Sequence, residues 1–567
     1  MGVVTNVSAL HSERQIKNWQ IMQADSNSEI FDTIVIGAGI TGMYQVYMLR
    51  QMGFSVRGYE AGGDVGGTWY WNRYPGCRLD TESYTYGFFC LKDIIPEWNW
   101  TEQFAAQPEL LRYANHAADK MDVRKDFRFN TSVLKASYNE AANLWDVEMD
   151  DGSRASCRYL LTAVGLLSAT RTPDIRSLDS FKGEYFHTSR WPHDEHGDGG
   201  SKKIDFTGKR VGVIGTGATG VQIIPVIAET AAELYVFQRS PNWCTPLGNN
   251  PISPERMENL KQNYDNIFAY IKTTDTAFPY HRYPKKAVDV SAEEREEFFE
   301  KLYNTPGYGL WLGSYKDLIL NKESNKFLAD FIANKIRQRV NNPAVAEKLI
   351  PKEYFGAKRV PMETNYYEVY NRDNVHLVDI RESPITRITA MGIETVDNKF
   401  DLDVIIFATG FDAITGAIDR INIRGKGGLA LKDVWKDGPV SYLGLQTTGF
   451  PNLFTLVGAH NGAAFCNIAV CGGLQVDWVS KMLRDMRNRN LTYAEAEEPA
   501  QNKWAEDIHR EFARTLMAEG DAWWVKVTVN PDGSKTRRAL AYLSGGQEYR
   551  KICDRVAYCN YEGFSLK

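Results

Sequence analysis

Two segments of the chain repeat the same order of a short β-branched run, a glycine-rich turn and an apolar helical stretch. The first spans residues 31–60 with its glycines at 37–42, and the second spans residues 210–237 with its glycines at 215–220. A strand that enters a helix through a tight glycine turn aims backbone N–H groups and the positive helix end at a pyrophosphate. The repeat therefore predicts two Rossmann-like dinucleotide-binding domains in an α/β chain.

The residue that ends the second strand of each unit differs in charge. The first unit ends at Glu60, about twenty residues beyond the glycines, where an acid binds ribose hydroxyls. The second has Arg239 and Ser240 there, which would bind a 2′-phosphate that an acid would repel. Two dinucleotide sites in one chain usually mean that a hydride passes between two cofactors, and the fixed partner of a nicotinamide is most often FAD. We therefore predict FAD in the first unit and NADP in the second. The alternatives are a plain tight turn at the first loop and a solvated cation at Arg239.

These motifs give the nucleotide-binding residues that we expect in each unit. For FAD they are Gly37, Gly39, Gly42 and Glu60, and for NADP they are Gly215, Thr216, Gly217, Thr219, Gly220, Arg239 and Ser240.

Charge and cysteine content narrow the class of partner. The formal net charge is -5 and no long run of like charges occurs, which argues against nucleic acid or an anionic membrane and favours a small-molecule partner. The eight cysteines show no spacing typical of a metal site or a disulfide framework, so we expect neither. Such cysteine usage fits a reducing compartment, and we expect a cytoplasmic location. Residues 438–476 lack charged side chains, but Pro, Asn and paired Gly interrupt them; we expect buried loop and short helix beside a cofactor.

The changes of pattern along the chain predict a discontinuous first domain. Strand-like runs at 375–378 and 402–407 suggest a return to the first sheet after the second unit. The expected domains are an N-terminal arm at 1–30, the FAD-binding domain at 31–165, the NADP-binding domain at 166–375 with a helical insertion at about 251–348, and the second part of the FAD-binding domain with the C-terminal segment at 376–567.

One long motif carries a resemblance to a known family. Residues 181–192 read FKGEYFHTSRWP, which matches the F-x-G-x-x-x-H-x-x-x-W-P fingerprint of Baeyer-Villiger monooxygenases. Further similar patterns lie at 66–80, 403–411 and 549–564, so the resemblance covers residues 31–564. It implies an FAD enzyme that converts ketones to esters or lactones with NADPH and O2 through a C4a-peroxyflavin.

The resemblance also implies roles for particular residues. Arg359 matches the active-site arginine and Asp80 the carboxylate that orients it, although the two could form an ordinary salt bridge. His187 resembles a residue that couples the domains, and we assign it no proton transfer. The remaining expected cofactor contacts are Thr68, Trp69, Tyr86 and Val133 for the flavin, Lys358 for the NADP phosphate, and Trp523 for the nicotinamide cofactor.

Three other functions compete with this interpretation. A flavin N- or S-hydroxylating monooxygenase lacks the Trp191-Pro192 end of the fingerprint and leaves Arg359 unexplained. A disulfide reductase needs a C-x-x-C motif, which the sequence lacks, and a non-catalytic nucleotide sensor needs neither Asp80 nor Arg359.

The expected substrate is an apolar ketone. The resemblance is strongest with terpenoid-lactonising members, and aromatic segments at 98–100, 278–280 and 523–524 suggest a pocket for medium to bulky ketones. Few basic clusters are present to hold CoA phosphates, so we expect no requirement for a CoA thioester. The expected partners are the ketone and O2, with the protein a monomer or homodimer.

Overall fold

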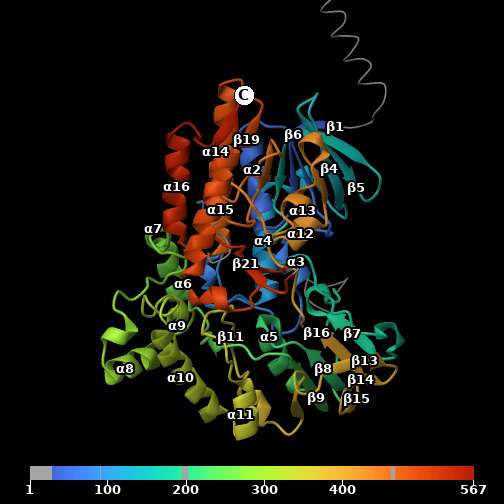
Figure 1. Ribbon diagram of the computed structural model, residues 1–567, viewed down its shortest axis with the longest axis vertical. Coiled ribbons are helices and arrows are strands. Elements are labelled where there is room, and N and C mark those ends of the chain that lie inside the picture. Colours follow the sequence, from blue (N-terminus) through green and yellow to red (C-terminus); the bar gives the residue numbers. More distant parts are fainter. Residues whose placement is uncertain (1–28, 90, 93, 194–201, 462–465, 531) are drawn as a thin grey trace, which may run out of the picture.

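The computed structural model describes residues 29–567 apart from 90, 93, 194–201, 462–465 and 531 (Figure 1). The predicted arm at 1–30 lies outside the described residues, except that its last two residues begin the first strand.

The first dinucleotide unit belongs to an eight-stranded sheet with the order β17-β4-β5-β6-β1-β2-β3, in which β18 also pairs with β6. The run at Ile34–Ile36 is buried because helices and the antiparallel strands cover both faces of the parallel centre. The strands are β1 Glu29–Ile36, β2 Val56–Tyr59, β3 Phe127–Arg128, β4 Val133–Asn139, β5 Leu144–Met149, β6 Arg154–Thr162, β17 Asn422–Arg424 and β18 Leu453–Thr455.

Helix α2, Ile40–Gln51, follows the first glycine turn and packs beside α14, Ile468–Asn488 (Figure 1). The Tyr44 hydroxyl donates to Asp477 Oδ1 at 2.6 Å, and Gln45 Nε2 donates to Ser480 Oγ at 2.8 Å. The other helices of this half are α3 Thr68–Trp71, α4 Gln107–Met121, α12 Gly416–Asp419, α13 Leu431–Val434, α15 Glu498–Ala513 and α16 Gly546–Tyr558.

The second unit forms a five-stranded parallel sheet in the order β12-β9-β8-β16-β7. The prediction that residues 375–378 and 402–407 rejoin the first sheet was wrong, because β12 pairs with β9 and β16 pairs with β7 and β8. The chain therefore returns to the first sheet only beyond Phe407, at β17. The elements are β7 Glu184–His187, β8 Arg210–Ile214, α5 Ala218–Ala228, β9 Glu233–Gln238, β12 Val375–Asp379 and β16 Val404–Phe407, with an antiparallel flap of β13 Ile385–Thr389, β14 Gly392–Thr395 and β15 Lys399–Asp401.

Helices occupy the segment where an insertion was predicted. Ser253, Ser291, Asn321 and Asn342 cap four of them by accepting hydrogen bonds from backbone N–H groups. The short strands β10 Thr245–Pro246 and β11 Met362–Glu363 pair at its base. The helices are α6 Pro254–Gln262, α7 Tyr264–Ile271, α8 Ala292–Tyr303, α9 Gly309–Leu312, α10 Lys322–Arg339 and α11 Pro343–Leu349.

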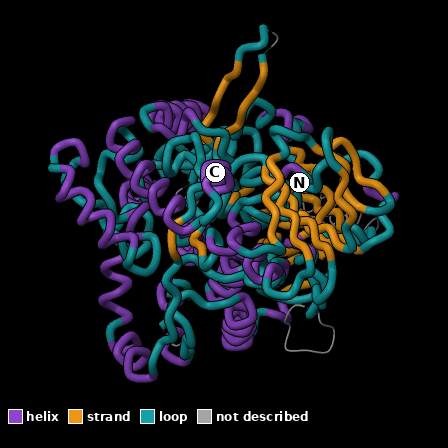
Figure 2. Tube along the Cα trace, turned by 90° about the horizontal axis from the view of Figure 1, so that it is seen from below, coloured by secondary structure: helices purple, strands orange, loops and turns teal. Residues whose placement is uncertain are grey.

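The C-terminal segment contributes a projecting hairpin and a strand that returns to the body. The hairpin, β20 Val525–Val529 and β21 Lys535–Ala539, extends away from the rest of the molecule in Figure 2. The strand β22 Phe564–Leu566 pairs with β19 Ala494–Ala496. Across the described residues, no helix has both the length and the hydropathy needed to cross a membrane.

One loop of the first half rests on the second unit. The Tyr74 hydroxyl donates to Gln222 Oε1 of α5 at 2.7 Å, and Gln222 Nε2 donates to the Arg78 carbonyl at 3.1 Å. Gly76 has φ +81°, and a Cβ there would lie 2.5 Å from the Gln222 carbonyl oxygen. Only glycine fits this approach, which fixes the loop that leads to Asp80.

We predict that Gln222→Ala lowers the Tm, because it leaves the buried Tyr74 hydroxyl without its carboxamide acceptor, at a cost of roughly 1 to 3 kcal/mol. Differential scanning calorimetry measures the shift. Gln262→Ala, which removes an amide that donates to the exposed Glu258, serves as the matched control. Equal Tm values for the two variants would contradict the assigned contact.

Candidate active site

The first glycine turn leaves no room for side chains. Gly37 has φ +106°, and a Cβ there would lie 2.6 Å from the Ala163 carbonyl oxygen. A Cβ on Gly42 would lie 1.8 Å from the Gly37 carbonyl oxygen, which indicates that the helix starts tight against the turn. Gly39 precedes α2 as its N-cap, without a capping side chain. This cradle fits a pyrophosphate at the helix N-terminus.

Glu60 lies at the end of β2 beside this turn, as predicted. Its buried carboxylate accepts hydrogen bonds from the N–H groups of Ala38 and Gly62, both at 2.7 Å. The Glu60 carbonyl accepts from the Thr131 N–H at 2.9 Å, which brings the start of β4 and Val133 toward the same end of the sheet.

The expected flavin-side residues gather around α3. Thr68 is exposed at its first position, and the Trp69 indole N–H donates to the Tyr86 hydroxyl at 3.2 Å. A Cβ on Gly67 would lie 2.7 Å from the Gly39 Cα, so α3 begins against the glycine turn. The two motifs thus form one surface.

The second glycine turn has the same construction. Gly215 has φ +111°, and a Cβ there would lie 2.5 Å from the Ala408 carbonyl oxygen, whereas a Cβ on Gly217 would meet nothing within 4 Å. A Cβ on Gly220 would lie 2.3 Å from the Gly215 carbonyl oxygen. Thr219 lies in the first turn of α5. The open side at Gly217 fits a second pyrophosphate.

Three candidate NADP residues meet at the end of β9. The Thr216 hydroxyl donates to the Ser240 carbonyl at 3.0 Å, and Lys358 Nζ lies 3.5 Å from Ser240 Oγ. Arg239 is exposed beside them. Lys358 also pairs with Glu353 at 2.8 Å, a carboxylate that sequence reasoning did not include.

Asp80 and Arg359 come together from the two halves of the molecule. Arg359 Nη2 donates to Asp80 Oδ2 at 2.5 Å, and the Tyr308 hydroxyl donates to the same oxygen at 2.7 Å. The Arg359 Nη2 also lies 3.2 Å from the Tyr308 hydroxyl oxygen. Burial lowers the pKa of Arg359, but Asp80 and Tyr308 outweigh it and raise that pKa, so the guanidinium is charged.

One nitrogen of the Arg359 guanidinium differs from the others in its surroundings. Its Nε is buried and has no hydrogen-bond partner among the described residues. Buried donors are normally satisfied, so this atom fits a site in which a bound cofactor or substrate supplies the acceptor. Sequence reasoning missed Tyr308, which is 2% exposed and lies in the predicted insertion, because an isolated tyrosine between helices carries no motif.

One of the three aromatic segments that were predicted to form a pocket contributes a residue, Tyr280, to a cavity. A cavity between the insertion and the C-terminal segment is lined by Tyr280, Trp311, Leu318, Met517 and Leu543. Phe278 packs against Tyr308 with ring centroids 5.8 Å apart. Residues 98–100 and 523–524 are not among the lining residues, and Trp98 and Trp100 pack instead against Tyr113 of α4.

Trp523 lies three residues after Gly520, which packs against the loop that carries Lys358 and Arg359. A Cβ on Gly520 would lie 2.9 Å from the Ala357 Cβ of that loop. Trp523 itself is half-buried, with its ring centroid 5.0 Å from that of Trp524.

The fingerprint at 181–192 spans the edge of the second sheet and a contact with the first half. His187 ends β7, where its Nε2 lies 3.4 Å from the Thr409 hydroxyl. Arg190 lies over the Trp71 ring at 4.3 Å from its centroid. Burial lowers the pKa of His187, so its imidazole is neutral at pH 7.

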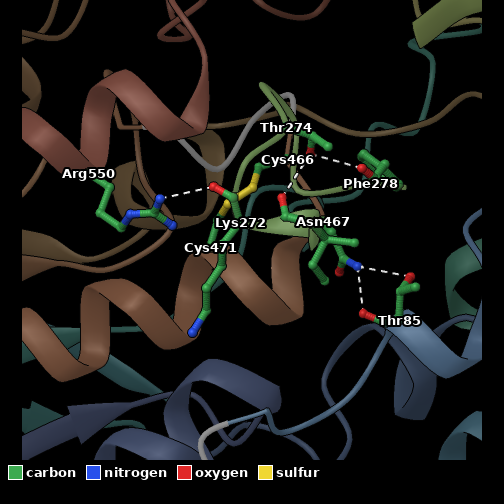
Figure 3. The surroundings of a disulfide bond; sticks show 9 residues. Thr85, Lys272, Thr274, Phe278, Cys466, Asn467, Cys471 and Arg550 are labelled. Atoms are coloured by element: carbon green, nitrogen blue, oxygen red, sulfur yellow. Dashed lines mark hydrogen bonds between the residues drawn. A yellow bond between two sulfur atoms is a disulfide. The ribbon is translucent and has the colours of Figure 1, made fainter. Parts of the chain in front are cut away.

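The expectation of a chain without disulfides was wrong at one place. Cys466 and Cys471 are bonded, with their Cα atoms 6.2 Å apart, at the start of α14 (Figure 3). Between them, Asn467 Nδ2 donates to the Thr85 carbonyl at 2.6 Å. The sequence did not predict this disulfide, because a separation of five residues across the start of a helix belongs to no common disulfide framework.

Comparison with known proteins gives one domain match and several full-length relatives. A profile described as an NAD(P)-binding Rossmann-like domain matches residues 35–93. The chain is 64% identical over 546 residues to 2-oxo-Delta(3)-4,5,5-trimethylcyclopentenylacetyl-CoA monooxygenase of Pseudomonas putida, covering 96% of this chain and 100% of the relative. It is 39% identical to a Baeyer-Villiger monooxygenase of Pseudooceanicola batsensis, with 96% of each chain covered.

Two further likenesses bear on the chemistry. A phenazine N-monooxygenase of Lysobacter antibioticus is 36% identical, with 96% of this chain and 98% of the relative covered. The crystal structure of OTEMO in complex with FAD and NADP superimposes with a TM-score of 0.92 at 63% identity, over 95% of this chain and 100% of that one.

We predict that Arg239→Ala weakens NADP⁺ binding about 10- to 150-fold and leaves NAD⁺ binding nearly unchanged, since a charge-assisted hydrogen bond contributes about 1.5 to 3 kcal/mol. Isothermal titration calorimetry with both nucleotides measures the difference. Lys182→Ala, which removes an exposed cation of the same unit, is the control. An unchanged ratio of the two affinities would refute a phosphate contact at Arg239.

Proposed function

Because this chain belongs to the Baeyer-Villiger monooxygenase family, we propose that Arg359 and Asp80 form its catalytic pair and that its substrates are cyclic ketones of terpenoid size. The protein is an FAD- and NADP-dependent monooxygenase that converts ketones to esters or lactones with O2. The observation that carries the residue assignment is the charged Arg359, which Asp80 and Tyr308 hold while its Nε has no hydrogen-bond partner in the described part of the chain.

Each of the two glycine turns fits a different cofactor. The first turn with Glu60 fits FAD, and the second with Ser240, Arg239 and Lys358 fits NADP. FAD, when bound, accepts a hydride from NADPH and activates O2. The task left to the chain is to place the ketone, exclude water and supply a fixed positive charge.

Arg359 supplies that charge. Asp80 and Tyr308 fix one edge of the guanidinium, so its buried Nε is oriented before substrate arrives. A fixed cation in a site sheltered from bulk water stabilises negative charge that develops on oxygen more strongly than a mobile, hydrated one. Asp80 acts through Arg359, and its removal would leave the guanidinium held less firmly, by the Tyr308 hydroxyl.

The cavity between the insertion and the C-terminal segment supports an apolar ketone. Trp311 lies at its wall and also packs against Tyr308, with ring centroids 5.4 Å apart, so the cavity adjoins the Arg359 cluster. Leu318, Met517 and Leu543 add apolar surface. Such a site orients a ring by shape and discriminates weakly, because one methylene contributes only about 1 to 3 kcal/mol.

The β20–β21 hairpin of the C-terminal segment adds a basic feature that the sequence-based expectation of few basic clusters did not include. Lys526 of β20 stands directly opposite Arg538 of β21, although like charges in a cross-strand pair repel. The pair favours a negatively charged extension of the substrate. We infer that a CoA thioester, as in the name of the Pseudomonas putida relative, strengthens binding here without being required.

Hydroxylation at nitrogen or sulfur is the weaker candidate, although one relative is named for it. That reaction uses a protonated, electrophilic oxidant and gives no role to a cation as firmly fixed as Arg359. The complete fingerprint ending in Trp191-Pro192 also favours ketone oxidation.

We predict that Arg359→Ala lowers ester formation roughly 100- to 1,000-fold, the usual cost of losing a fixed group that stabilises developing charge. Asp80→Ala should lower it less, because the guanidinium remains but is no longer oriented. Gas chromatography of the ester measures the product, and anaerobic bleaching of the flavin by NADPH shows that cofactor reduction survives.

Arg387→Ala is the matched control for these variants, since it removes an arginine paired with Glu394 in the β13–β14 flap. Normal ester yield from Arg359→Ala would overturn the proposed catalytic pair.

We predict that simple cyclic ketones and the corresponding CoA thioester are both oxidised, with a lower KM for the thioester. Lys526→Ala should raise the KM for the thioester and leave that of the free ketone unchanged, because only the thioester carries phosphates. Steady-state kinetics on both substrates decide this. No turnover without the thioester would contradict the proposal.

A further inference from the structure

We infer that Glu82 and Tyr280 are positioning residues: they hold Tyr308 in place, and Tyr308 in turn holds the Asp80–Arg359 pair in place. The inference rests on the proposed role of Arg359 and extends it to two residues that touch neither Arg359 nor Asp80 by a hydrogen bond between side chains.

The geometry is a continuous chain of hydrogen bonds. The Tyr280 hydroxyl donates to Glu82 Oε1, and its oxygen accepts from the Tyr308 N–H at 3.1 Å. The Tyr308 hydroxyl then donates to Asp80 Oδ2 at 2.7 Å, beside the Arg359 contact. The backbone of Tyr308 is thus held by Tyr280, while its side chain holds the catalytic pair.

The backbone next to Tyr308 is adapted to this contact. Gly307 has φ +90°, and a Cβ there would lie 2.1 Å from the Tyr280 hydroxyl oxygen and 2.8 Å from Glu82 Oε1. Any other residue at position 307 would displace the pair, so the glycine lets it reach the chain.

Glu82 is an unusual residue to find in this place. It is 3% exposed, and its second oxygen, Oε2, has no hydrogen-bond partner among the described residues. Burial raises the pKa of Glu82 to about 7, while the hydrogen bond from Tyr280 lowers it. A buried carboxyl group held this way changes its charge near neutral pH.

The charge state decides which way the Tyr280 hydroxyl points. When Glu82 is ionised it only accepts, so the Tyr280 proton turns toward it and the oxygen lone pairs face the Tyr308 N–H. When Glu82 is protonated, its own O–H can donate to the Tyr280 oxygen and compete with the Tyr308 N–H. Burial raises the pKa of Tyr280, which keeps that hydroxyl protonated throughout.

The other charged and titratable groups around Glu82 are few. Asp80 and Tyr84 face it from its own segment, Tyr280 from the loop after α7, and Arg256 of α6 approaches through Tyr84. Arg359 lies beyond Tyr308. Asp80 is paired with the Arg359 cation, whereas Glu82 forms no ion pair among the described residues.

The test is the coupling ratio, the ester formed per NADPH oxidised, measured on the FAD-loaded enzyme with a cyclic ketone. In the wild type this ratio should fall about tenfold as pH drops through about 7, because Glu82 gains its proton and loosens Tyr308. Glu82→Gln keeps an acceptor for Tyr280 but cannot titrate, so its ratio should stay at the high-pH value. Tyr280→Phe should be about tenfold lower at every pH, with the KM for NADPH unchanged.

An infrared difference spectrum of the FAD-loaded protein gives a readout independent of turnover. A protonated-carboxyl band with a midpoint near pH 7 should be present in the wild type and absent in Glu82→Gln. The band midpoint should move to higher pH in Tyr280→Phe, because removing the hydroxyl removes a donor that stabilises the carboxylate.

Tyr264→Phe is the matched control. It removes a buried hydroxyl of α7 that has no hydrogen-bond partner among the described residues, so its coupling ratio and carboxyl band should match the wild type.

The same fall of coupling with pH in Glu82→Gln as in the wild type, or a normal ratio in Tyr280→Phe, would overturn the inference. Arg359→Ala measured in parallel separates the two levels. If it forms ester normally, the proposed function of Arg359 fails; if it does not while the Glu82 and Tyr280 variants behave as wild type, only this inference fails.

Discussion

The structure depends on bringing one carboxylate and one guanidinium together from opposite halves of the chain. Asp80 and Arg359 are 279 positions apart, and both are partly sheltered from water. Either charge alone in that setting would be costly, because the lost hydration would not be replaced. The ion pair therefore favours the relative placement of the two dinucleotide units in which both charges meet.

That placement is held by contacts on two sides. The loop 74–80 rests on α5 through Tyr74 and Gln222, while Arg190 of the fingerprint lies over Trp71. Both contacts join the second dinucleotide unit, through α5 or the fingerprint, to the segment of the first half that lies beside the expected flavin contacts. The long family fingerprint thus marks a joint between units, and the glycine turns mark the cofactor sites themselves.

The sequence predicted the glycine turns because their signal is local. A strand, a turn with positive φ at Gly37 or Gly215, and a helix are all encoded within about twenty residues. Strands β12 and β16 were assigned to the wrong sheet for the opposite reason. A short buried parallel strand is apolar in either sheet, and its pairing partners are set by distant segments.

The residues around Arg359 could be predicted only where a motif of the family includes them. Asp80, Arg359 and Lys358 were found through the resemblance, and the structure brings the first two together and sets Lys358 beside Ser240. Tyr308 was not predicted, and Tyr280 was expected only as part of an aromatic pocket, because both lie between helices of the insertion and their hydrogen-bond partners are decided by tertiary packing.

The pairing order of the first sheet has a consequence for how the chain is made. The end of β6 pairs with β18, and β4 pairs with β17, yet the whole second sheet is synthesised between these partners. At about 5 to 20 residues per second, a ribosome extends the chain for tens of seconds before β18 emerges. Throughout that time the apolar edge at Leu160–Leu161 is open to other chains, so a nascent molecule of this design depends on protection while it is still attached to the ribosome.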